Sequence, residues 1–213
     1  MPTIRQIAGQ RAAQMLRDDR DMATPPVVAV RTLADLERHL VHGSARIEEI
    51  SRADLKAAIL WRDVPDRHSI WVRAKYTSYR SAYRRFIGQA YDGVDWDGFA
   101  DLDVDHILNR ARLKRLDYYV RLEAVRWDIN QQHGRTVEAA AGKNPREKKT
   151  GKGERPLTAL SILKLAGLQA PSSPSDQAAI DAARRFLIGS QRWHPLAADQ
   201  GLADMLHRAY EVR

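Results

Sequence analysis

The stretch DLDVDHILNRARLKRLDYYVRLEAVRWDINQQHGRTVE, residues 101–138, is the part of the chain around which the rest is organised. It holds two apolar, strand-like segments, at residues 102–108 and 118–125, joined by the basic connector NRARLKRLD. After the second segment the sequence turns polar at RWDINQQHG, which favours a short helix. We therefore predict the order strand, loop, strand, helix, with an Asp-His pair at one end and an Asn at the other.

Three polar side chains of this stretch suit hydrolysis of a phosphodiester. An imidazole titrates near neutrality, so His106 could take a proton from the attacking water. Asp105 and the side-chain carbonyl of Asn130 are hard oxygen ligands suited to Mg²⁺ or Mn²⁺, which would polarise the phosphoryl oxygen. Neighbouring residues of a strand point to opposite faces, so Asp105 and His106 share one ion only if the strand ends or bulges there.

The motifs DVDHIL and N-x-x-x-G, with a basic loop and a second strand between them, resemble the HNH, or ββα-metal, endonucleases. The likeness is nearest to the HNH domain of the RNA-guided CRISPR effectors, and it covers residues 101–138 only. It implies that Asp105 and Asn130 bind the metal and that His106 is the general base. The chain departs from many HNH proteins because it has no cysteine, and hence no zinc knuckle.

The third metal ligand that the resemblance requires is not identified by its motif. Asp103, His133 and Glu138 are the candidates for an additional ligand or an outer-shell partner. The same residues also permit a simpler interpretation, because a D-x-D-H run is short and occurs in loops. In that case the two aspartates solvate a turn and Asn130 caps a helix.

Composition favours a polyanionic partner. The 213 residues suffice for one domain with a sizeable core or for two small ones, and they carry a net charge of +8. A basic surface fits nucleic acid better than a membrane, and we expect DNA rather than RNA. No secretory signal is visible and no apolar run approaches the roughly 20 residues that cross a bilayer, so we expect a cytoplasmic protein.

The cationic side chains expected to contact nucleic acid lie within and just before the central stretch. A basic loop beside a metal site suits a phosphate backbone. The upstream segment KYTSYRSAYRRFIGQAY has aromatic residues at steps of three and four, which predicts a helix with a basic outer face. Its aromatic side chains either face the core or stack on bases. The candidate contacts are Arg84, Arg85, Arg110, Arg112, Lys114, Arg115 and Arg121.

These patterns predict an α+β protein, mostly helical, with a small ββα-metal core embedded between N-terminal and C-terminal helices. An amphipathic helix is expected over residues 3–18, with Arg11 on its polar face, and the S/T-x-x-D capping patterns predict helices over 33–42 and from Ser51 through Trp61. The expected regions are residues 1–68, helical; 69–141, the core with its preceding basic helix; 142–156, a basic flexible linker; and 157–213, helical.

Three functions are consistent with this sequence. The first is a metal-dependent endonuclease with His106 as general base and one divalent cation held by Asp105 and Asn130. The second is a basic protein that binds nucleic acid without cleaving it. The third is a nuclease toxin, or another interaction protein, whose basic surface binds an acidic protein partner.

Overall fold

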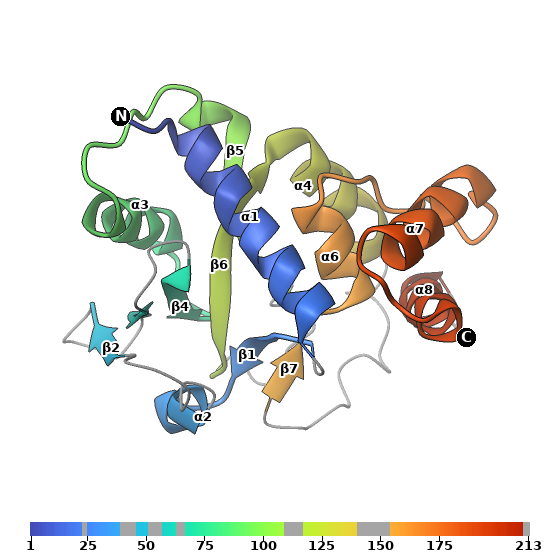
Figure 1. Ribbon diagram of the computed structural model, residues 1–213, viewed down its shortest axis with the longest axis horizontal. Coiled ribbons are helices and arrows are strands. Elements are labelled where there is room, and N and C mark those ends of the chain that lie inside the picture. Colours follow the sequence, from blue (N-terminus) through green and yellow to red (C-terminus); the bar gives the residue numbers. More distant parts are fainter. Residues whose placement is uncertain are drawn as a thin grey trace.

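A computed structural model describes residues 1–22, 25–38, 46–50, 57–62, 67–108, 117–139 and 154–210. Helices surround a seven-stranded sheet, and every strand pair described in it is antiparallel (Figure 1). The strands are β1 (Val27–Val30), β2 (Arg46–Glu49), β3 (Ala57–Trp61), β4 (Ser69–Arg73), β5 (Leu102–His106), β6 (Tyr119–Arg126) and β7 (Glu154–Pro156). The mixed α+β class is therefore confirmed.

Seven α-helices of at least six residues lie in these described ranges. They are α1 (Ile4–Asp21), α2 (Leu33–Arg38), α3 (Tyr79–Ala90), α4 (Trp127–His133), α6 (Ala159–Leu165), α7 (Gln177–Gly189) and α8 (Pro195–Tyr210). A 3₁₀ turn, η2 (Phe99–Asp101), precedes β5, and a π-helical turn, η4 (Gly134–Glu138), continues α4. None of the helices in these ranges is both long and apolar enough to cross a membrane.

Strand β6 is the centre of the sheet. The strand order is β2-β3-β4-β6-β1-β7, and β5 pairs with β6 outside this path. Leu122 of β6 is matched with Ile70 of β4 and also with His106 of β5. Strands β4 and β5 therefore lie on opposite edges of β6, and β5 and β1 follow one another along the same edge.

Helix α1 confirms the amphipathic helix predicted near the N-terminus. It begins with a capping box, in which Thr3 and Gln6 each accept a hydrogen bond from the other's backbone N–H. The helix crosses in front of β6 (Figure 1). Arg11 departs from the prediction, because it is buried instead of lying on the polar face. Its Nε and Nη2 donate to the carboxylate of Glu123 on β6, at 2.9 and 2.8 Å.

The segment AAILW was predicted to be helical, and this prediction is wrong. It forms strand β3 between β2 and β4, with Ala57–Leu60 buried. A short apolar run has no period that separates a strand from a buried helix, and burial on both faces favours the strand. Strands β1, β2 and β3 lie in the same sheet as β4 and β6, so the region 1–68 contributes strands to the sheet as well as helices α1 and α2.

Other predicted elements are confirmed by their caps. Thr32 and Asp35 form the expected reciprocal pair at α2, with both hydrogen bonds at 3.0 Å. Asp176 caps α7 by accepting from the backbone N–H of Ala179. Helices α7 and α8 pack together, and α8 also contacts α6 and η4. The possible helix start at Ser51 and most of the expected linker at 142–156 lie outside the described residues.

The strand, strand, helix order predicted for the central stretch is present. Strands β5 and β6 are antiparallel neighbours paired from Leu102↔Arg126 to His106↔Leu122. Helix α4 begins at the residue that follows β6 and contacts both strands. The basic connector between the two strands spans residues 109–117, and all of it except Asp117 lies outside the described part of the chain.

Candidate functional site

The side chains of β5 divide between two environments. Leu102 and Val104 belong to the apolar cluster that includes Tyr83 and Phe86 of α3. Asp103 and Asp105 alternate with them, and their partners come from α3, α4 and α6. The face of β5 that carries these two aspartates is called here the acidic face.

Asp103 is held by three donors on the acidic face. The amide nitrogens of Asn130 and Gln131 lie 3.1 and 3.2 Å from its Oδ2, and Arg80 of α3 lies 2.5 Å from its Oδ1. Burial alone would raise the pKa of Asp103, but these hydrogen bonds and the Arg80 charge outweigh burial and hold it below its usual range. Asp103 is therefore an ionised carboxylate at neutral pH. Asn130 thus reaches the acidic face, with its amide group directed at Asp103.

Asp105 shares a buried ammonium with Glu138. The Nζ atom of Lys164 on α6 lies 2.7 Å from Oδ2 of Asp105 and 2.6 Å from Oε1 of Glu138. The lysine side chain is only 1% exposed. Burial would lower its pKa, yet the two carboxylates raise the pKa of Lys164 above its usual value, so it is a cation placed between two anions.

His133, at the end of α4, lies near the same group of charges. Its Nε2 is 2.8 Å from the carbonyl oxygen of Leu168, which makes Nε2 the protonated nitrogen and leaves Nδ1 with its lone pair. Nδ1 is buried and has no hydrogen-bond partner among the described residues. Burial, opposed by the Leu168 bond, lowers the pKa of His133 to about 4, so the ring is neutral at pH 7.

His106 lies on the opposite side of β5. Its ring centroid is 4.8 Å from that of Tyr79 at the start of α3, and the residue is 3% exposed. The strand does not bulge here, because its pairing with β6 is regular. His106 is paired with Leu122, and the backbone N–H of the next residue, Ile107, donates to the carbonyl oxygen of Arg121. The structure therefore brings Asp103, Asp105, Asn130, His133 and Glu138 toward the acidic face and leaves His106 on the other.

The donor chemistry of the acidic face fits Mg²⁺ or Mn²⁺, because carboxylate oxygens are the ligands these ions prefer. The arrangement departs from a finished metal centre. Among the described residues, no group of three or more histidine, aspartate or glutamate side chains could hold a metal ion as placed. Lys164 occupies the position between Asp105 and Glu138 that a cation would take.

The predicted nucleic-acid contacts fall into three groups. Arg84 and Arg85 are exposed on α3, and the Arg84 guanidinium lies over the ring of Trp96, 4.8 Å from its centroid. Arg121 is engaged inside the protein, because its Nε and Nη2 donate to Glu123 at 3.0 and 2.8 Å. Arg110, Arg112, Lys114 and Arg115 lie outside the described residues.

Lys164 is the member of this group that the sequence interpretation missed. It stands in TALSILKL, where an ionisable residue interrupts an apolar helix that is buried on all sides. A lysine in such a position needs a carboxylate partner, so the signal was present. Comparisons of the chain with protein-family models, with curated proteins and with solved structures find no significant match.

Proposed function

We propose that the protein is a metal-dependent endonuclease that acts on phosphodiester bonds at the acidic face of β5. The observation that supports this is the meeting of side chains from three separate elements: Asp103 and Asp105 from β5, Asn130 from α4 and Glu138 from η4. Metal-dependent hydrolysis of a phosphodiester uses such a group of oxygen ligands to hold the cation, and the net charge of +8 suits a polyanionic substrate.

A divalent cation bound at this face would polarise the phosphoryl oxygen and stabilise the leaving oxygen. Asp105 and Glu138 are the carboxylates available to hold it, once Lys164 is displaced from between them. Lys164 would then be free to pair with the substrate phosphate. Asp103 holds the amide groups of Asn130 and Gln131 in place at the same face.

Two imidazoles are candidates for accepting the proton of the attacking water. His106 is the residue that the sequence indicates, but it packs on Tyr79 across the strand from Asp105. His133 is neutral and has an acceptor nitrogen near Asp105 and Lys164, but it is fully buried. Replacing each histidine by alanine shows which one is the base. Only loss of the true base should lower the cleavage rate by about 10²-fold or more without a matching loss of stability.

The proposal is tested by a cleavage assay on supercoiled plasmid and on single-stranded RNA. The wild-type protein is expected to cut at least one of them with Mg²⁺ or Mn²⁺ and neither with EDTA. Asp105→Asn and Asn130→Ala should reduce the rate by about 10²-fold or more. Asp92→Asn, which neutralises an exposed carboxylate in the turn before β5, is the matched control and should leave the rate unchanged. Wild-type protein that is inert on both substrates with both metals rejects the proposal.

A second candidate function is binding of nucleic acid without cleavage. The position of Lys164 favours it, because the ammonium already supplies a cation between Asp105 and Glu138 without a metal. This alternative requires affinity that falls steeply with salt and does not respond to EDTA, in a protein that leaves its ligand intact.

A further inference from the structure

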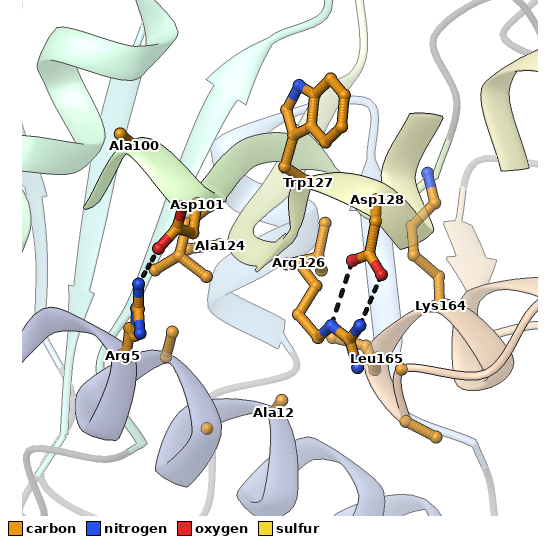
Figure 2. Close-up of a pocket in the computed structure, with 16 residues that line it drawn as sticks. Arg5, Ala12, Ala100, Asp101, Ala124, Arg126, Trp127, Asp128, Lys164 and Leu165 are labelled. Carbon is orange, nitrogen blue, oxygen red and sulfur yellow. Dashed lines mark hydrogen bonds and ion pairs between the residues drawn. The ribbon is translucent and has the colours of Figure 1, made fainter. Parts of the chain in front are cut away.

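A pocket of about 710 Å³ lies beside the acidic face, and the mechanism above does not use it. It is bounded by α1, by the end of η2, by the junction of β6 with α4, and by the end of α6 (Figure 2). Its volume is within the range of small-molecule sites, about 300–1,000 Å³. Most of its lining residues are small or apolar. Among them are Ala8, Gly9, Ala12, Ala124, Val125 and Ala166.

The mouth of the pocket combines an exposed aromatic ring with two arginines. Trp127, the first residue of α4, is 50% exposed, and Figure 2 places its indole on the outer side of the rim. Arg5 pairs with Asp101, and Arg126 pairs with Asp128 through Nε and one terminal nitrogen. All four of these charged side chains are more than half exposed.

We propose that this pocket binds an unpaired nucleobase of single-stranded nucleic acid, with the adjoining phosphate at Arg126 and Arg5. The choice of nucleic acid as the ligand rests on the proposed function. Small apolar walls leave space for a flat ring, and the half-exposed indole on the outer side of the rim is a stacking platform for the next base along the strand. Exposed ion pairs contribute little, so a phosphate can replace an aspartate on either guanidinium at small cost.

The position of the pocket relates it to the acidic face. Trp127 and Asn130 are on the same helix, and their three-residue separation corresponds to about 4.5 Å of rise along the helix axis. Lys164 also connects the two sites, since it lines the pocket while its Nζ contacts Asp105. A base held at Trp127 would therefore place the neighbouring stretch of backbone beside Asn130 and the β5 carboxylates.

Gly9 offers a substitution that obstructs the pocket without damaging the fold. It is exposed on α1, and a Cβ at this position would meet nothing within 4 Å. Gly9→Leu therefore places a bulky side chain at the pocket wall and should stabilise the helix by roughly 0.5–1 kcal/mol. Gly88 on α3 is equally open and exposed but does not line the pocket, which makes Gly88→Leu the matched control.

The test measures binding of a fluorescein-labelled 12-nucleotide oligo(dA) by anisotropy in EDTA, so that no cleavage occurs. Trp127→Ala should weaken binding by about 5- to 100-fold, whereas Trp127→Phe should retain most of the affinity. Gly9→Leu should weaken it to a similar degree, and Gly88→Leu should not. A blunt duplex of the same length should show no difference between Trp127→Ala and wild type, because its bases are already stacked.

Competition experiments show which part of the nucleotide the pocket recognises. If dAMP displaces the labelled oligonucleotide at concentrations at which neither adenosine nor inorganic phosphate does so, the pocket recognises a base and a phosphate together. Unchanged oligonucleotide affinity in both Trp127→Ala and Gly9→Leu overturns the inference, even if metal-dependent cleavage is observed. Loss of binding in both variants, in a protein that never cleaves, supports the pocket and rejects only the endonuclease.

Discussion

The ammonium group of Lys164 lies within 2.7 Å of both the Asp105 and the Glu138 carboxylates, so a single buried cation joins β5, η4 and α6. Two anions and one cation leave the group one negative charge in excess. We expect this relationship to govern the stability of the region and, under the proposed function, its binding of a divalent ion.

Replacing Lys164 by methionine should destabilise the protein by about 3–5 kcal/mol, because two partly buried carboxylates lose their counter-charge. Adding Mn²⁺ should then raise the melting temperature of Lys164→Met more than that of the wild type. The substitution removes the ammonium from between the two carboxylates, and an ion that binds there stabilises only the folded state. Thermal unfolding with and without metal measures both effects. Lys75→Met, at an exposed lysine, is the control. A variant with wild-type stability would contradict the structure at this site.

His133 predicts a pH dependence of stability. Its pKa is about 4 in the folded protein against 6.5 as a model value, so below pH 6.5 the unfolded state takes up a proton that the folded state does not. The free energy of unfolding should therefore fall by about 3 kcal/mol as the pH decreases from 6.5 to 4. Urea denaturation across this range should show a smaller fall for His133→Gln. His194→Gln, the same exchange at an exposed histidine, is the control.

The buried ion pair between Arg11 and Glu123 should be costly to break from one side. Glu123→Gln leaves the guanidinium of Arg11 in the core without its anion, and we expect a loss of about 3–5 kcal/mol. Arg11→Met should cost less, because Arg121 continues to pair with Glu123. A double-mutant cycle by chemical denaturation gives the coupling energy directly. Losses that simply add would show that the two side chains do not interact.

Replacement of His106 requires its own control, because the ring packs against Tyr79. His106→Ala should lower the melting temperature through lost packing, whatever its catalytic role. Tyr79→Ala removes the same ring contact and keeps the imidazole. If His106→Ala loses cleavage activity and Tyr79→Ala retains it at a similar melting temperature, the imidazole itself is needed. Equal losses in both would assign His106 to packing alone.

Local patterns were sufficient to predict the central unit. Strands β5 and β6 and helix α4 follow the expected order, since alternation and polarity changes act over a few residues. The predicted caps at α2 and α7 are present for the same reason. The AAILW segment was misassigned because only tertiary pairing with β2 and β4 distinguishes its strand from a helix.

The spatial grouping of the site was harder to predict than its members. Asp103 and Asp105 share a face because they are two residues apart on a strand, which the sequence implies. The partner of Asp105 could not be assigned from the 101–138 stretch alone, because Lys164 is 59 residues away in the chain. Arg11 was placed on a solvated face for a similar reason, since its partner Glu123 is 112 residues away.

That 112-residue separation also bears on biosynthesis. At roughly 5–20 residues per second, Arg11 is incorporated about 6 to 22 seconds before Glu123 is added. Throughout that interval α1 has neither its anion nor the central strand on which it packs. The nascent polypeptide is thus expected to acquire its native topology only after the residues of β6 have been added.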